Sequence, residues 1–167
     1  AKRDQRLEKL YEMGGYFKKL WDERVDKEPT PDLISMMIHS EAMKDMGMGE
    51  FMGNLVLLIV GGNDTTRNSM TGLAYALNKF PDQRAMLEAD PSLIPNAVSE
   101  IIRWQTPLAH MRRTALVDTE LEGQKIKAGE KIVMWYISGN RDESIFPDAD
   151  KLDIKRENAR RHLSFGY

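Results

Sequence analysis

Apolar residues recur at steps of three and four over the first hundred positions of the chain, which is the spacing of α-helices that bury one face. In the charge-rich segment 2–28 the apolar positions are Leu7, Leu10, Phe17, Leu20 and Trp21. Gly14 and Gly15 lie within this segment, and because glycine weakens a helix we expect an interruption or a kink there. A second helix is expected to begin near Thr30, with Thr30 as its N-cap and Pro31 in its first turn.

The longest helical pattern runs through LLIVGGNDTT at residues 57–66. Large apolar residues lead directly into two glycines, an amide, an acid and two hydroxyls. Apolar and small residues nevertheless keep the same spacing as far as Leu77. A strand would not keep this phase, so the pattern predicts one helix from about residue 50 to 79, ended by Pro81.

The pattern changes after residue 80. PDQRAMLEAD predicts a short helix, and SEIIRW belongs to a predicted helix at about 94–104. At about 112–138, short β-prone pieces are separated by Glu122-Gly123 and Ala128-Gly129, which predicts hairpins. Residues 139–167 show little periodicity and are expected to form an ordered loop. The sequence therefore predicts a mainly α fold with small β hairpins.

Composition excludes several classes of protein. The chain has 167 residues, of which 41% are hydrophobic and 30% charged, as expected for a globular domain with a core. A net charge of −2 gives no reason to expect nucleic acid as a partner. The chain has no cysteine, which excludes a disulfide framework and a thiolate metal site within it. The longest apolar run, LVLLIV, is too short to span a bilayer, so no transmembrane segment and a cytoplasmic location are expected.

Three interpretations of GGNDTT compete. A nucleotide-binding loop would need a GKS or GKT ending, or spaced glycines between a strand and a helix, and the sequence has neither. A glycine pair at a helix crossing explains Gly61 and Gly62 but not the acid and hydroxyls at Asp64, Thr65 and Thr66. A helix broken in its middle to make room for a flat ligand explains all of them. The adjacent acid and alcohol then suit proton delivery, in which the alcohol orients a water and the carboxylate relays protons from solvent.

GGNDTT resembles the oxygen-binding signature of the cytochrome P450 haem-thiolate monooxygenases, Ala/Gly-Gly-x-Asp/Glu-Thr-Thr/Ser. A second motif, Glu100-x-x-Arg103, lies one short helix downstream, as it does in that family. Alone, a pair with this spacing is an ordinary surface ion pair. The resemblance implies instead a buried network with a second arginine, matched here by Arg156 in LDIKREN. Glu100, Arg103 and Arg156 are therefore assigned a structural role.

The resemblance also implies which residues contact haem. Gly61 and Gly62 would let the helix lie close to the haem and to the substrate. In HMRRTA, Arg113 matches the family's ligand for one haem propionate, with Arg112 as the alternative one residue away. His162, in RRHLSFG, matches the ligand of the other propionate. Nothing assigns a metal site to the remaining histidines.

The last residues, Phe165, Gly166 and Tyr167, resemble the start of the family's cysteine loop, and Phe165 is expected to contact the cofactor. The axial cysteine is expected beyond Tyr167, so no iron ligand is assigned here. On this basis we expect a fragment that covers the central-to-late part of the cytochrome P450 fold, truncated before the cysteine loop. Alone, it is expected to be inactive and unable to hold haem in the thiolate-ligated form.

For the parent protein the resemblance implies a haem b monooxygenase that uses O2 and electrons from NAD(P)H, delivered by a ferredoxin and a ferredoxin reductase. Asp64 and Thr65 would be the catalytic pair. The motifs and their flanks look most similar to the bacterial branch that hydroxylates the terminal carbon of medium-chain alkanes and fatty acids. Apolar residues flank the motifs, as a small apolar substrate requires: Leu57, Leu58, Leu108 and Met111. The alternatives are a fatty-acid or terpene hydroxylase of another branch and a non-enzymatic helical module.

Overall fold

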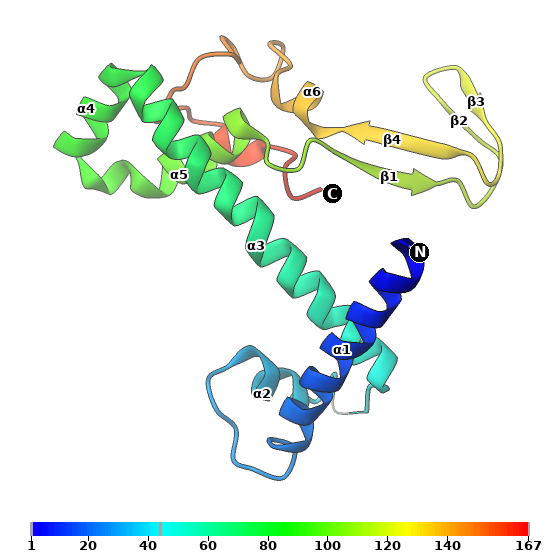
Figure 1. Cartoon of the computed structure of the whole chain (residues 1–167). Helices are drawn as coiled ribbons and strands as arrows, with labels where there is room; N and C mark the ends of the chain where they lie inside the picture. Colours follow the sequence, from blue (N-terminus) through cyan, green and yellow to red (C-terminus); the bar gives the residue numbers. More distant parts are fainter. Residues whose placement is uncertain (1, 44, 167) are drawn as a thin grey trace. The chain divides into compact units, whose positions relative to one another are not determined.

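The computed structural model describes residues 2–43 and 45–166, without the side chains of residues 2, 3 and 6. Tyr167, the last residue of the predicted cysteine-loop start, lies outside the described residues. The described chain is mainly helical and has two small antiparallel sheets, so the predicted fold class is confirmed (Figure 1). It forms two compact units, 1–61 and 62–167. The boundary falls inside α3 (Met48–Lys79), and the prediction of one partial domain over 1–167 stays a prediction.

The first unit consists of α1 (Lys2–Asp22), α2 (Leu33–Ile38) and the beginning of α3. Its buried core is formed by Met37, Phe51 and Leu55. Trp21 of α1 packs edge-to-face on Phe51 of α3, with ring centroids 4.6 Å apart. The predicted apolar face of the first helix thus meets the first turns of the long helix.

Two local predictions in this unit need correction. The helix α1 runs through Gly14 and Gly15, so an interruption there is wrong and the alternative, a kink, stays a prediction. Each glycine costs only about 1 kcal/mol, which tertiary packing offsets. The N-cap of α2 is Asp32, whose Oδ1 accepts a hydrogen bond from the Ser35 amide at 2.9 Å. Thr30 supports the cap indirectly, since its hydroxyl donates to Asp32 Oδ2 at 2.5 Å.

The helices of the second unit follow the predicted order. After the end of α3 come α4 (Pro81–Ala89), a short 3-10 helix, η1 (Pro91–Leu93), and α5 (Ile94–Gln105). The bounds of α3 and α5 differ from the predicted ones by at most two residues. Gly72 lets these two helices approach closely, because an added Cβ there would lie 2.8 Å from Cγ of Gln105. The buried core comprises Ala76, Ala97, Ile101, Trp104, Leu152 and Ile154.

The strands of this unit form two antiparallel pairs. β1 (His110–Thr114) pairs with β4 (Lys131–Trp135), and β2 (Thr119–Leu121) pairs with β3 (Gln124–Ile126) between them (Figure 1). The predicted turn at Glu122-Gly123 joins β2 to β3, with positive φ values of 47° and 79° at its two residues. Two successive positive φ angles are typical of the type I′ turn that closes short hairpins.

The predicted loop 139–167 is only partly correct. Its first residues belong to α6 (Tyr136–Asn140), and a 3-10 helix, η2 (Ala159–Arg161), lies near its end. The rest of the segment is irregular but well packed, because it buries Phe146, Leu152 and Ile154. Side chains from the helices rather than a strand ladder therefore hold its backbone, and these contacts define the site.

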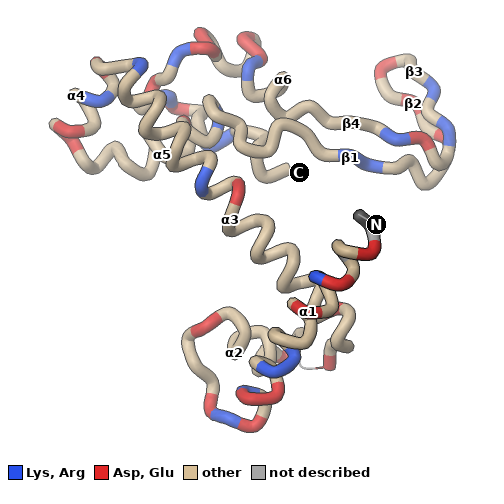
Figure 2. Tube along the Cα trace, viewed as in Figure 1, with Lys and Arg blue, Asp and Glu red and all other residues tan. Residues whose placement is uncertain are grey.

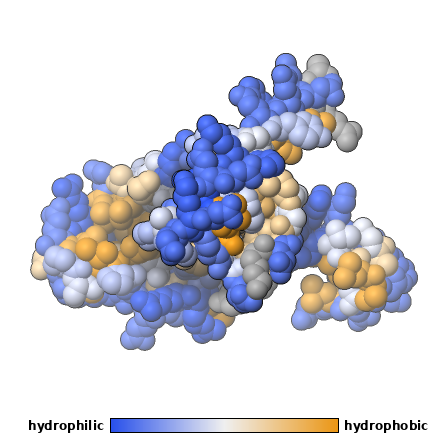
Figure 3. Space-filling view, turned by 90° about the horizontal axis from the view of Figure 1, so that it is seen from below, coloured by the Kyte–Doolittle hydropathy of each residue, from blue (hydrophilic) through white to orange (hydrophobic). Residues whose placement is uncertain are grey.

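Charge and hydropathy vary sharply along α3. Residues 51–63 of this helix carry no charged side chain, which makes them a continuous uncharged stretch in Figure 2. Many large apolar side chains remain exposed on the described surface, where they alternate with hydrophilic ones (Figure 3). Even so, no helix in the part of the chain that the structure describes has the length and apolarity needed to cross a membrane.

Candidate functional site

The motif GGNDTT lies inside an unbroken helix. The α-helical conformation of α3 continues from Met48 to Lys79, so the predicted break in its middle is wrong. The reason is energetic: two glycines lower helix propensity by about 1 kcal/mol each, which the many backbone hydrogen bonds of a long helix tolerate. Room beside this helix must therefore come from the missing side chains alone.

Gly61 and Gly62 do provide such room. Both are exposed, and a Cβ added to either would meet no described atom within 4 Å. The contrast with Gly72, where an added Cβ would collide with Gln105, separates the two kinds of glycine in one helix. The interpretation as a helix crossing therefore fits Gly72, and the glycine pair borders open space of the kind a flat ligand needs.

The acid and the alcohol of the motif follow one turn later. Asp64 is exposed and pairs with Arg67, whose Nη2 lies 2.8 Å from the Asp64 Oδ1. An exposed ion pair of this spacing contributes only a few tenths of a kcal/mol, so Arg67 holds the carboxylate only weakly. Thr65 is partly buried, and its carbonyl accepts a hydrogen bond from the Ser69 hydroxyl at 2.8 Å.

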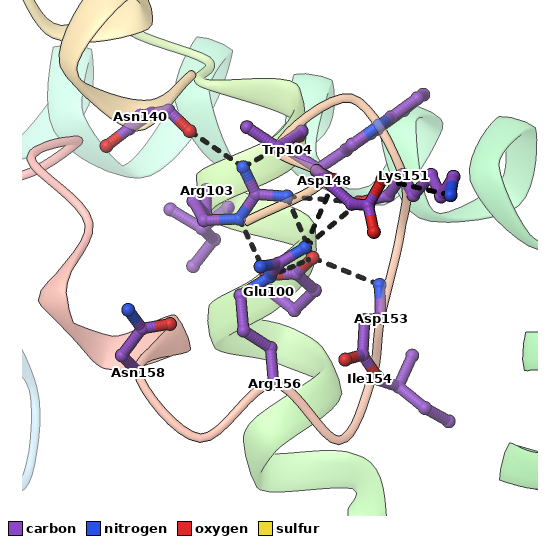
Figure 4. A network of polar contacts seen from close by, with 12 residues as sticks. Glu100, Arg103, Trp104, Asn140, Asp148, Lys151, Asp153, Ile154, Arg156 and Asn158 are labelled. Carbon is purple, nitrogen blue, oxygen red and sulfur yellow. Dashed lines mark hydrogen bonds and ion pairs between the residues drawn. The ribbon is translucent and has the colours of Figure 1, made fainter. Parts of the chain in front are cut away.

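The three residues predicted to form a buried network do lie together (Figure 4). Glu100 and Arg103 are fully buried, with an exposed fraction of 0% each, and Arg156 is 8% exposed. Arg103 binds the Glu100 carboxylate with two parallel hydrogen bonds, from Nε at 2.7 Å and from Nη2 at 2.8 Å. Arg156 Nε donates to the same carboxylate at 3.1 Å. The Glu100 carboxylate thus accepts hydrogen bonds from both arginines.

Every N–H of Arg103 has an acceptor. Besides Glu100, its guanidinium donates to three backbone carbonyls of the following segment: Asn140 at 2.7 Å, Ala149 at 2.9 Å and Lys151 at 3.2 Å. A guanidinium has five N–H donors in a fixed plane, so all of them are satisfied. The carbonyl dipoles take up part of the positive charge that one carboxylate cannot neutralise.

The sequence analysis missed two amide side chains that hold Arg156 in place. Asn96 of α5 donates to the carbonyls of Ile154 and Arg156, at 2.9 and 3.1 Å. Gln83 of α4 accepts from the amide of Ile154 at 3.0 Å. Asparagine and glutamine on helices are mostly exposed, so nothing in the sequence singles out Asn96 and Gln83 as partners of a distant segment.

The predicted haem-contacting side chains lie in two segments, the strand β1 and the residues that follow η2. Arg113 lies on β1 with an exposed side chain, and its Nη1 donates to the carbonyl of Arg112 at 3.3 Å. His162 follows η2 and is buried, and its ring meets that of Phe165 edge-to-face at 4.9 Å. Phe165 itself is 80% exposed. His162 and Phe165 line one pocket together with Ser99, Arg160 and Gly166.

The protonation of His162 follows from its surroundings. Burial lowers the pKa of His162 below its usual value of 6.5, and the nearby charge of Arg103 acts in the same direction. Its Nδ1 accepts a hydrogen bond from the Ser164 amide at 3.3 Å, so the neutral ring carries its proton on Nε2. His162 thus offers one N–H donor to a carboxylate.

Each of these residues has a chemical character that suits a haem. Arg113 offers a charged donor and His162 a neutral one, which matches a cofactor with two carboxylates. The open space beside Gly62 and the exposed ring of Phe165 suit a flat apolar group. With no cysteine, the chain supplies no thiolate for the iron, and the described residues contain no group of three or more His, Asp and Glu that could hold a metal.

Replacing Glu100 with Gln should lower the free energy of unfolding by about 3–5 kcal/mol, because it leaves two buried arginines without their carboxylate. The matched control is Glu88→Gln, which removes the exposed partner of Arg84 on the neighbouring helix and should have a far smaller effect. Urea denaturation measures both. Equal effects of the two substitutions would contradict a buried network.

The lowered pKa of His162 predicts acid sensitivity. Above about pH 6.5 the folded and unfolded states are both neutral at this ring, and stability is complete. Below it, the unfolded chain binds a proton that the folded chain does not, so stability falls with pH. Replacing His162 with Gln should reduce the loss between pH 7.5 and 5.5 in urea denaturation, and His110→Gln, at an exposed position, should not. The same loss in all three proteins would refute this assignment.

Comparison with known proteins agrees with this geometry. The family model for cytochrome P450 matches residues 4–166. The structure of CYP153D17 from Sphingomonas sp. PAMC 26605 is 69% identical, with a TM-score of 0.90 over 97% of this chain and 40% of that one. Linalool 8-monooxygenase from Pseudomonas putida is 42% identical over 94% of this chain and 38% of its own length. Methyl-branched lipid omega-hydroxylase from Mycobacterium bovis is 43% identical over 81% of this chain and 32% of its own.

The chain therefore spans 40% or less of the length of these proteins. Within that span, the order of the motifs, the position of the long helix and the buried glutamate–arginine network all agree with one assignment. The match covers nearly every residue, and it includes a solved structure more than two-thirds identical in sequence. The chain belongs to the cytochrome P450 family of haem proteins.

Proposed function

We propose that this chain is part of a haem-dependent monooxygenase, which inserts one atom of O2 into a C–H bond while the other atom leaves as water. The observation that carries the proposal is the position of an acid, Asp64, and an alcohol, Thr65, directly after two glycines that border open space. All four residues lie on the long helix of a chain that matches the cytochrome P450 family. Haem b, bound through a thiolate, supplies the activation of O2. The chain has no cysteine, so that thiolate is not among its residues.

The residues of this chain have separate roles in the proposal. Arg113 and His162 hold the two carboxylates of the cofactor and so fix its orientation. Asp64 exchanges protons with solvent, since it is exposed and forms only a weak ion pair. Thr65 orients a water that passes these protons on.

The substrate that we propose is a medium-chain alkane or fatty acid, hydroxylated at its terminal carbon. Motifs and flanks resemble the bacterial branch with this activity, and the name of one relative specifies omega-hydroxylation of a methyl-branched lipid. Apolar side chains flank the motifs, as an apolar substrate would require: Leu57, Leu58 and Met111 are exposed, and Leu108 is half-buried. A terpene is the second candidate, because another relative is a linalool 8-monooxygenase.

Electrons are proposed to come from NAD(P)H through a ferredoxin and its reductase, since cytochrome P450 enzymes generally work with redox partners. The cytoplasmic location expected from the sequence stays a prediction. The match of the cytochrome P450 family model to residues 4–166 argues against a purely structural helical module.

The experiment that tests the function supplies the whole protein with haem, NADH, a ferredoxin and its reductase, and then offers n-octane, dodecanoic acid and linalool separately. We expect 1-octanol from octane and the 12-hydroxy acid from dodecanoic acid, both identified by gas chromatography and mass spectrometry. Product from linalool alone would favour the terpene alternative, and no oxygenated product from any substrate would refute the proposed function.

Replacing Thr65 with Ala should uncouple oxygen consumption from hydroxylation, because the water that delivers protons loses its hydroxyl partner. The fraction of NADH electrons recovered as hydrogen peroxide should rise from a minority to a majority. Thr65→Ser keeps the hydroxyl and should retain coupling, and Thr66→Ala tests the neighbouring hydroxyl. Unchanged coupling in Thr65→Ala would remove this residue from proton delivery.

A further inference from the structure

Asn140, the last residue of α6, is completely buried and uses its whole carboxamide. Its Oδ1 accepts a hydrogen bond from the Leu163 amide at 2.7 Å. Its Nδ2 donates to two hydroxyls, Thr106 Oγ1 at 3.0 Å and Ser164 Oγ at 2.9 Å. Its backbone carbonyl accepts from Arg103 Nη1, a contact visible in Figure 4. One residue therefore joins the glutamate–arginine network to the segment that follows His162.

The two hydroxyls can only accept from this amide. Thr106 Oγ1 already donates its proton to the carbonyl of Arg103 at 2.7 Å, and Ser164 Oγ donates to the carbonyl of Ile102 at 3.1 Å. The position therefore requires two donors on one side and one acceptor on the other, which an asparagine side chain supplies and an aspartate does not. Replacing Asn140 with Asp would face a buried carboxylate toward two oxygens with no free proton.

Thr106 supplies an independent observation. It caps α5 in the left-handed conformation, with φ 45° and ψ 67°. This conformation is unfavourable for a β-branched residue and persists only where surrounding contacts enforce it. The contacts here are the two hydrogen bonds of Oγ1, one of which comes from Asn140. The strained backbone of Thr106 thus places an acceptor where Asn140 needs one.

The segment held by Asn140 is the one that orients His162. Leu163 and Ser164 follow this histidine directly, and the Ser164 amide donates to His162 Nδ1. This bond fixes the ring and its tautomer, with Nε2 as the donor available to a ligand. Displacement of residues 163–164 would release both constraints. The orientation of His162 therefore depends on the side chain of Asn140, which lies outside the RRHLSFG motif.

We propose that Asn140 is a positioning residue, whose carboxamide holds Leu163 and Ser164 so that His162 presents Nε2–H to a carboxylate of the cofactor. The haem contact of His162 rests on the proposed function, whereas the positioning of its ring does not. The carbonyl of Asn140 ties this arrangement to Arg103, so the network that organises α5 also sets the histidine.

The test compares Asn140→Asp and Asn140→Ala in the whole protein. The matched control is Asn158→Ala, since Asn158 also donates through Nδ2 but only to the carbonyl of Ile145, at 2.6 Å. The first readout is the tautomer of His162, from ¹⁵N–¹H NMR of histidine-labelled protein in the diamagnetic ferrous, carbon monoxide-bound form, with His110 as internal reference. The second is the rate of haem transfer to apomyoglobin.

In the unmodified protein and in Asn158→Ala we expect His162 as the pure Nε2–H tautomer. Both Asn140 variants should give a mixture of tautomers and lose haem about tenfold faster, which corresponds to about 1.4 kcal/mol. Ser164→Ala removes one partner only and serves as the milder variant if Asn140→Ala does not fold. It should shift the tautomer in the same direction.

An unchanged tautomer of His162 in Asn140→Asp and Ser164→Ala would overturn the proposal, as would an equal change in the Asn158→Ala control. A changed tautomer with an unchanged rate of haem loss would uphold the positioning by Asn140. That result would instead refute the haem contact of His162 in the proposed function, so the two failures are distinguishable.

Discussion

A single buried carboxylate, that of Glu100, forms ion pairs with two arginines, Arg103 and Arg156. Burying these charges is costly unless each finds an opposite charge and full hydrogen bonding. That requirement determines much of the second unit, because the remaining donors must be met by backbone carbonyls. The irregular segment after α6 supplies them at Asn140, Ala149 and Lys151. The network on α5 therefore holds the backbone of this irregular segment in place.

The glutamate–arginine network also affects the candidate cofactor site, because it holds the backbone of Asn140. Arg103 fixes the carbonyl of Asn140, and the side chain of Asn140 fixes Leu163 and Ser164. His162 and the exposed ring of Phe165 belong to the same short stretch. The motif of Glu100 and Arg103, to which the sequence assigned a structural role, thus also affects how His162 is oriented. Stability and site geometry depend on the same contacts.

The sequence predicted the elements whose signal is periodic. The long helix and the helix carrying Glu100 were predicted within two residues, since helical spacing is a local property. Neither a break at GGNDTT nor an interruption at Gly14-Gly15 is found, because propensity is a small term beside packing and backbone hydrogen bonding. Asn140, Asn96 and Gln83 could not be found, because their partners lie 23 to 71 residues away in the chain. The spacing of residues along the chain does not indicate hydrogen bonds between segments so far apart.

The roles proposed for Asp64, Thr65, Arg113 and His162 all depend on a haem bound beside them. A crystal structure of the haem-bound whole protein tests this claim most directly. The account predicts Arg113 and His162 Nε2 within hydrogen-bonding distance of different haem carboxylates, with both arginines still on Glu100. A haem whose carboxylates contact other residues, or a Glu100 that has released Arg156, would contradict it.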